Sequence, residues 1–205
     1  QIIAQPVSVT VNQGGNVRLE AEFFGSGPYT FMWYRGSTFY SGGSQSPTYL
    51  FNAQPAQAGS YTVQITNAAG TVTSAAATVT VLTPSDQWRV THFGAAANTG
   101  HAADAADPDG DGIVNLLEYA LGTNPNAVTS SPYGLSVDGD GRLVLSVTKN
   151  PAATDLQYAA QASGDLVTWS SGDVTVLTND GTTFTARDNA AIGSRRFLRL
   201  VVTRP

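Results

Sequence analysis

The first part of the chain, residues 1–82, alternates between apolar and polar positions, and Gly, Pro, Asn and Ser interrupt the alternation. A period of two places successive side chains on opposite faces of the backbone, so each alternating run predicts a β-strand. Five such runs are VSVTV (7–11), VRLEAEF (17–23), TFMWYR (30–35), SYTVQIT (60–66) and AAATVTV (75–81). Short strands at this spacing are typical of an all-β sandwich.

The pattern becomes helical after residue 82. Thr83 is a residue type that caps helix N-termini, Pro84 suits the first helical position, and Gly94 is a residue type that ends helices. A second helix is predicted over NLLEYALG, residues 115–122. We therefore expect a short helical connector over residues 83–126.

Alternation returns in the last part of the chain. The runs that predict strands here are GRLVLSV (141–147), LQYAAQAS (156–163), DVTVLT (173–178), TTFTAR (182–187) and RFLRLVV (196–202). The segments DGDG (138–141) and NDG (179–181) predict hairpin turns. The expected fold class is mainly β, with two β-sandwiches joined by the helical connector. The expected domains are residues 1–82, 83–126 and 127–205.

Three segments of the first domain carry a family resemblance: GGNVRLEA, the tryptophan at position 33, and AGSYTVQITNAAG. Together they resemble the immunoglobulin-like domains found in tandem in secreted bacterial proteins. The resemblance places Ala21 and Val63 where antibody-type domains carry two cysteines, Trp33 as the core tryptophan, and Tyr61 as the corner tyrosine. It implies that two apolar side chains pack against the indole in place of a disulfide. Gln57 departs from the Asp that the family usually has, which affects a local turn.

A second resemblance covers the C-terminal part. The segments SGDLVTW and RRFLRLVV resemble a small sandwich that closes the C-terminus of many large secreted bacterial proteins. The first residues, QIIAQPVSV, lack the basic start and long apolar core of a signal peptide. We expect the sequence to be a mature fragment or one portion of a longer protein.

Composition narrows the classes of partner. The formal net charge is −5, only 12% of the residues are charged, and Lys149 is the only lysine, so we expect no nucleic-acid partner. There are no cysteines, which excludes disulfides and thiolate metal sites. No stretch is apolar enough to span a bilayer, so no membrane span is expected.

Four of the fifteen acidic residues lie in one short segment, DPDGDGIVNLLE, residues 107–118. Carboxylates held this close together oppose folding unless a cation lies among them. The spacing matches a twelve-residue EF-hand loop, in which Gly112 at position 6 permits the sharp turn. Calcium takes six to eight oxygen ligands, and this type of loop supplies them from defined positions. The predicted ligands are Asp107, Asp109, Asp111, the backbone carbonyl of Ile113, Asn115 directly or through water, and Glu118.

Two alternatives to calcium are a solvated acidic turn and magnesium, which prefers a tighter octahedron with retained waters. The segment resembles the single calcium motifs of dockerins and thrombospondin type 3 repeats, because no regular helix runs into position 1 and no second loop pairs with it. The stretch SVDGDGRLVLSV (136–147) has Ser136 and Val147 at positions 1 and 12, so a hairpin explains it better. A lone loop is a poor switch, so we expect the ion to have a structural role.

The other candidate sites are less specific. His92 and His101 are the only histidines, and neither lies in a recognisable nucleophile or metalloprotease motif, so we expect no enzyme activity. Aromatic residues on loops and outward strand positions of the first domain could stack on sugar rings. The predicted ligand-binding residues are Tyr34, Phe39 and Tyr40.

The function we expect is a non-catalytic, calcium-stabilised structural or adhesive segment of a larger secreted or cell-surface bacterial protein. Such a segment would be extracellular or at the cell surface and would contact other domains of the parent protein. One alternative is a carbohydrate-binding module attached to a polysaccharide-degrading enzyme, with a polysaccharide or cell-surface glycan as partner. Another is a subunit of an extracellular fibre, since free sandwich edges can support self-association.

Overall fold

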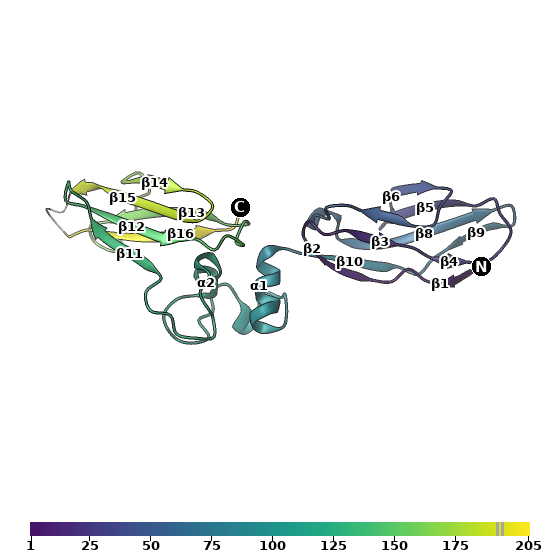
Figure 1. The fold of residues 1–205 in the computed structure, drawn as a ribbon, viewed down its shortest axis with the longest axis horizontal. Helices are drawn as coiled ribbons and strands as arrows, with labels where there is room; N and C mark the ends of the chain where they lie inside the picture. The colour runs from purple at the N-terminus through teal and green to yellow at the C-terminus, as the bar shows by residue number, and fades with distance from the viewer. Residues whose placement is uncertain (192, 194) are drawn as a thin grey trace. The chain divides into compact units, whose positions relative to one another are not determined.

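A computed structural model describes residues 1–191, 193 and 195–205, in which the chain forms two compact units, Gln1–Thr83 and Pro84–Pro205 (Figure 1). The chain is mainly β, as predicted. The helical segment predicted as a connector lies within the second unit from Pro84 onward. The boundary predicted after residue 126 stays a prediction. No helix in the described part of the chain is both long and apolar enough to cross a bilayer.

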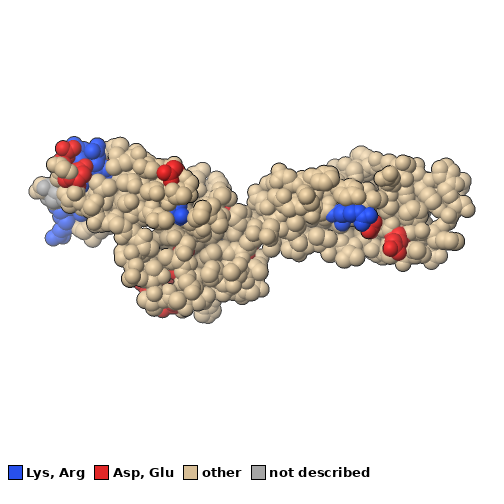
Figure 2. Space-filling view, viewed as in Figure 1, with Lys and Arg blue, Asp and Glu red and all other residues tan. Residues whose placement is uncertain are grey.

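The first unit consists of β-strands in two layers. Its elements are β1 (Ile2–Ala4), β2 (Val9–Asn12), β3 (Val17–Leu19), β4 (Glu22–Phe23), β5 (Thr30–Arg35), β6 (Thr38–Gly43), β7 (Thr48–Leu50), the 3-10 helix η1 (Pro55–Gln57), β8 (Gly59–Asn67), β9 (Gly70–Thr73) and β10 (Ala77–Leu82). One sheet has the order β2-β10-β8-β5-β6, with β9 on β8, and β3 pairs with β7 opposite it. Buried side chains of both layers form one hydrophobic core. The face of this unit seen in Figure 2 carries few charged side chains.

The core of the first unit has the arrangement that the resemblance implies. Ala21, Trp33 and Val63 are all buried in the same cluster, so apolar packing occupies the place of a disulfide. The hydroxyl of Tyr61 donates a hydrogen bond of 2.6 Å to the carbonyl of Gln57. A buried tyrosine that bonds back to the backbone just upstream is the corner geometry of immunoglobulin-type sandwiches.

The run 17–23, predicted as one strand, is divided into β3 and β4. At the break, the Ser46 hydroxyl donates to the carbonyl of Ala21 at 2.7 Å and accepts from its N–H at 3.2 Å. A side chain thus satisfies backbone groups that a neighbouring strand would otherwise satisfy. The chain can then change partner, so that β3 pairs with β7 and β4 with β1.

The second unit combines helices with a second sandwich. Its elements are α1 (Pro84–Phe93), the 3-10 helix η2 (Gly100–Ala102), α2 (Asn115–Leu121), β11 (Tyr133–Val137), β12 (Arg142–Thr148), β13 (Gln157–Ser163), β14 (Val174–Asn179), β15 (Thr183–Ala191) and β16 (Phe197–Thr203). One sheet has the order β11-β12-β15-β14, and β13 pairs with β16. Side chains of both sheets share one core.

Helix α2 is part of that core. Ala120 and Leu121 are buried in the same cluster as Phe184. The carbonyl of Ala120 accepts a 2.7 Å hydrogen bond from the Tyr158 hydroxyl and a 2.8 Å bond from the backbone N–H of Asn150. The helix ends where Gly122 adopts a left-handed conformation, φ 74°. The position of α2 is therefore fixed by the sandwich.

An ion-pair network holds the chain before the acidic loop. Asp104 accepts from Arg89 of α1 at 2.7 Å and from Arg204 at 2.9 Å, and Arg204 also bonds Asp155 at 3.1 Å. Burial raises the pKa of Asp104, but hydrogen bonds from Arg204 and Arg89 outweigh it, so the pKa lies below its usual value. The network joins α1, the segment after η2 and the end of β16.

Candidate metal centre

The acidic loop lies between η2 and α2 and brings its three aspartates together. One carboxylate oxygen from each of Asp107, Asp109 and Asp111 lies within 4.8 Å of the others. These are the residues predicted at positions 1, 3 and 5 of the calcium loop. Oxygens at this separation can reach a common cation of the size of calcium.

The loop backbone folds around these carboxylates. Asp107 accepts from the backbone N–H groups of Gly110 at 3.0 Å and Gly112 at 2.9 Å. Asp111 accepts from the N–H of Ile113 at 2.8 Å. Gly112 has φ 89°, a conformation that favours glycine and makes the sharp turn predicted at position 6. Local hydrogen bonds therefore pre-shape the loop.

Asp111 also connects the loop to the chain beyond α2. Its second carboxylate oxygen accepts from the backbone N–H of Thr129 at 2.8 Å. Thr129 lies just before β11, so the loop is joined to the segment that enters the sandwich. No local pattern indicates this contact, because the two residues are 18 positions apart.

Asn115 and Glu118 lie on α2 and are fully buried. The Asn115 amide donates to the carbonyls of His101 at 2.7 Å and Ala103 at 2.8 Å. Asn115 thus fixes the segment that precedes the loop, a role that sequence reasoning missed. One Glu118 oxygen accepts from the Thr123 hydroxyl at 3.3 Å, so the turn after α2 also contacts this carboxylate.

Three oxygens of the predicted ligands are buried without a hydrogen-bond partner among the described residues. They are Asp109 Oδ2, Asn115 Oδ1 and Glu118 Oε2. The amide oxygen of Asn115 is an acceptor, and the oxygens of Asp109 and Glu118 can only accept when the carboxylates are ionised. A hydrogen-bond donor or a cation would therefore satisfy all three atoms. Burial, followed by the charge of Asp109, raises the pKa of Glu118 from its usual 4.5 to about 7. The residues present fit a cation chemically.

Ile113 lies at position 7 of the loop, and its side chain is buried. The predicted role of Ile113 depends on its backbone carbonyl, and this role stays a prediction.

The hairpin assignment of the second acidic stretch is confirmed, because β11 and β12 pair around the turn at Asp138.

The aromatic residues predicted to bind a ligand do not form one surface. The rings of Tyr34 and Phe39 lie edge to face with centroids 6.1 Å apart, and Phe39 is 58% exposed. Tyr40 instead packs against the core, with its ring centroid 5.3 Å from that of Tyr61. The structure therefore brings two of the three residues together.

His92 packs on Trp88, with ring centroids 4.9 Å apart, and burial lowers the pKa of His92.

Comparisons with known proteins concern the first unit. Residues 1–81 match the family model of the immunoglobulin I-set domain, so this unit is an immunoglobulin-like domain. No curated protein matches the chain.

Solved structures similar to this chain include several with immunoglobulin domains. Sidekick-1 immunoglobulin domains 1–5 are 24% identical, with a TM-score of 0.38, over 40% of this chain and 19% of that chain. A complex of titin M10 with the obscurin-like 1 immunoglobulin domain is 29% identical, with a TM-score of 0.37, over 41% of this chain and 93% of that chain. Extracellular domains 3–5 of Drosophila OTK are 20% identical, with a TM-score of 0.35, over 40% of this chain and 30% of that chain.

Proposed function

We propose that the chain is a non-catalytic structural or adhesive segment in which one calcium ion, bound by the acidic loop, stabilises the second unit. The proposed ligands are the carboxylates of Asp107, Asp109 and Asp111, the carbonyl of Ile113, Asn115 and Glu118. The first unit contributes an immunoglobulin-like domain, a type generally structural or adhesive.

The observation that carries the calcium proposal is the burial of oxygens without partners on Asp109, Asn115 and Glu118. A solvated acidic turn would leave its carboxylates in water, whereas Glu118 is 0% exposed. Burying an ionised carboxylate without a counter-charge is costly. A cation among these oxygens would remove that cost.

Calcium fits this set of ligands better than other common divalent ions. The donors are all oxygens, which disfavours ions that prefer thiolate or imidazole ligands. The loop offers up to six protein groups, while magnesium usually keeps several waters and uses one or two carboxylates. Calcium accepts six to eight oxygens in a flexible geometry, as this loop can provide.

Helix α2 gives the ion a stabilising role. Its residues Asn115 and Glu118 are proposed ligands, while Ala120 and Leu121 belong to the sandwich core. Ligand binding that favours the folded state over the unfolded state raises the free energy of unfolding. Ordering the acidic loop against α2 should therefore stabilise the Pro84–Pro205 unit.

A secreted or surface location would suit such a site. Extracellular calcium modules work with dissociation constants of about 10⁻⁴–10⁻³ M, in the range of calcium outside cells. Immunoglobulin-like domains occur in multidomain adhesion and structural proteins, which supports a role as a spacer or adhesive segment.

Isothermal titration calorimetry of calcium into the metal-free chain tests the proposal. We expect one ion per chain, at least tenfold weaker binding for Glu118→Gln, and unchanged binding for Glu22→Gln, which alters an exposed carboxylate in the first unit. Magnesium should bind more weakly than calcium. An absence of calcium binding at millimolar concentrations would refute the site.

A further inference from the structure

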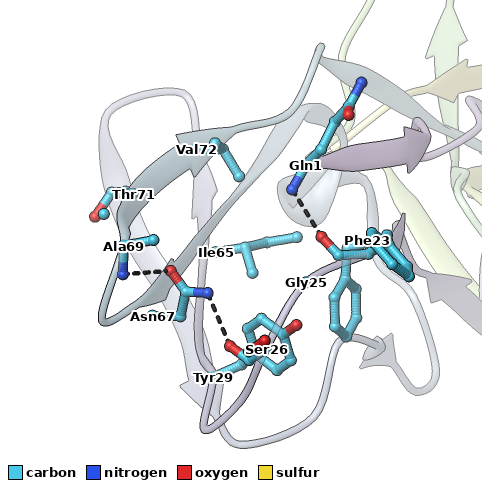
Figure 3. A pocket seen from close by; sticks show the side chains of 12 residues that line it. Gln1, Phe23, Gly25, Ser26, Tyr29, Ile65, Asn67, Ala69, Thr71 and Val72 are labelled. Carbon is cyan, nitrogen blue, oxygen red and sulfur yellow. Dashed lines mark hydrogen bonds between the residues drawn. The ribbon is translucent and has the colours of Figure 1, made fainter.

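A pocket of about 330 Å³ lies in the first unit, away from the acidic loop. Its walls come from the segment between β4 and β5 and from β8 and β9. Figure 3 shows Ile65 between Val72 and Tyr29, with Asn67 at one side and Phe23 at the other. The volume falls within the range of about 300–1,000 Å³ that is usual for small-molecule sites.

The apolar part of the pocket is built from aromatic rings on a buried floor. Ile65 is only 4% exposed, and the rings of Phe23 and Tyr29 meet edge to face with centroids 4.8 Å apart. Phe24 also lines the pocket and is 76% exposed. The backbone nitrogen of Gln1 donates to the carbonyl of Phe24 at 2.8 Å, which fixes the backbone that carries this ring (Figure 3).

The polar side chains that line the pocket are neutral. The Asn67 amide donates to the carbonyl of Ser26 at 2.9 Å and accepts from the N–H of Ala69 at 3.0 Å. These bonds hold the amide in place and leave it one further N–H and one further lone pair. The hydroxyl of Tyr29 makes no hydrogen bond within the described part of the chain, so it can both donate and accept. None of the lining side chains is charged.

We propose that this pocket binds one neutral pyranose ring of a glycan. The apolar C–H face of the sugar would lie on the aromatic side chains of Phe24 and Tyr29. The sugar hydroxyls would bond the Asn67 amide and the Tyr29 hydroxyl. A neutral amphiphilic ligand matches rings interleaved with fixed neutral donors and acceptors, whereas a charged ligand would lose solvation without meeting a charged side chain. This pocket is separate from the Tyr34–Phe39 pair that the sequence suggested.

Nuclear magnetic resonance titration of the isotope-labelled full chain tests this proposal. The probes are cello-, laminari-, xylo-, manno- and galacto-oligosaccharides, with oligogalacturonate as the charged comparison. We expect at least one neutral sugar to shift the resonances of Tyr29, Ile65 and Asn67. Binding should be equal with calcium and with EGTA, because the pocket belongs to the first unit. Failure of the calcium site would therefore leave this result unchanged.

Three variants locate the site. Phe24→Ala should weaken sugar binding about tenfold, and Tyr29→Phe, which keeps the ring and removes the hydroxyl, about fivefold. Phe51→Ala is the matched control, because it removes another exposed aromatic side chain of the same unit, outside the pocket, and it should change nothing. The melting temperature of each variant checks the fold.

Several outcomes would overturn the proposal. These are no binding of any neutral sugar, preference for oligogalacturonate, resonance shifts outside the pocket, or loss of binding in Phe51→Ala with Phe24→Ala unaffected. Binding of an apolar peptide in place of every sugar would also overturn it. Loss of sugar binding in Phe24→Ala with retention in Phe51→Ala would support it.

Discussion

Glu118 is fully buried and close enough to the acidic loop for the charges of the loop to act on its carboxylate. Its pKa is raised to about 7, first by burial and then by the charge of Asp109. The ionised Glu118 side chain therefore destabilises the folded state when no metal is bound, and stabilises it when a cation is bound. The two states predict opposite effects of the same substitution.

Glu118→Gln should stabilise the metal-free protein and abolish its stabilisation by calcium. At pH 8 without calcium, the variant removes a buried charge, and we expect the free energy of unfolding to rise by on the order of 2 kcal/mol. In saturating calcium the wild type should be the more stable of the two. Urea denaturation of both proteins in both conditions measures this. Equal stability of wild type and variant in saturating calcium would contradict the account.

The pH dependence of the metal-free protein follows from the same residue. The pKa of Glu118 is about 7 in the folded state and near 4.5 when unfolded. Between these values the folded state binds more protons, so the free energy of unfolding should fall as pH rises through this window.

Subtracting the pH profile of Glu118→Gln isolates this contribution. Burial lowers the pKa of His92, which should act in the opposite direction below pH 6.5 in both proteins and cancel in the difference. Denaturation in calcium-depleted buffer across pH 4.5 to 8 measures the profiles. Identical profiles for both proteins would show that Glu118 keeps its ordinary pKa.

At the scale of elements, the strands that the sequence predicted are those whose own residues favour a strand. The run TFMWYR coincides with β5, and the acidic loop, α1 and α2 also follow from local patterns. Strands β1, β6, β7, β9 and β11 lie outside the runs that were predicted as strands. In β6, Gly42 and Gly43 pair with Met32 and Phe31 of β5, so a neighbouring strand determines a conformation that local propensity does not favour.

The candidate site likewise combines features that the local sequence predicts with features that depend on contacts between distant segments. The spacing of Asp107, Asp109 and Asp111 predicted a cluster, because a short loop encodes it locally. The contacts of Asn115 with His101 and of Thr129 with Asp111 depend on how separate segments pack. No pattern within either segment indicates them.

The network around Asp104 should determine the stability of the second unit. Asp104→Asn leaves Arg89, which is 4% exposed, with a weakened counter-charge. We expect the free energy of unfolding to fall by about 2–3 kcal/mol, because removing one partner of a buried ion pair is costly. Thermal denaturation of the variant measures this.

The matched control is Glu20→Gln, which breaks the exposed pair between Arg18 and Glu20 in the first unit. Exposed pairs contribute about 0–1 kcal/mol, so this variant should melt almost as the wild type does. Equal loss of stability in the two variants would show that the Asp104 network has no special role.

At the scale of the whole molecule, the two units should respond differently to calcium. The proposed ligands and the helix that carries two of them lie in Pro84–Pro205, while Gln1–Thr83 has its own core. Domains with separate cores can unfold in separate transitions. Calcium should therefore act on one transition and leave the other unchanged.

Differential scanning calorimetry of the full chain, with EGTA and then with calcium at about a hundredfold above its dissociation constant, tests the central claim most directly. Calcium at that excess should add about 2.7 kcal/mol to the stability of the second unit and raise its melting temperature by on the order of 10 °C. The transition of the first unit should not move. If calcium shifts neither transition, or shifts both equally, the acidic loop does not stabilise the second unit as a calcium site.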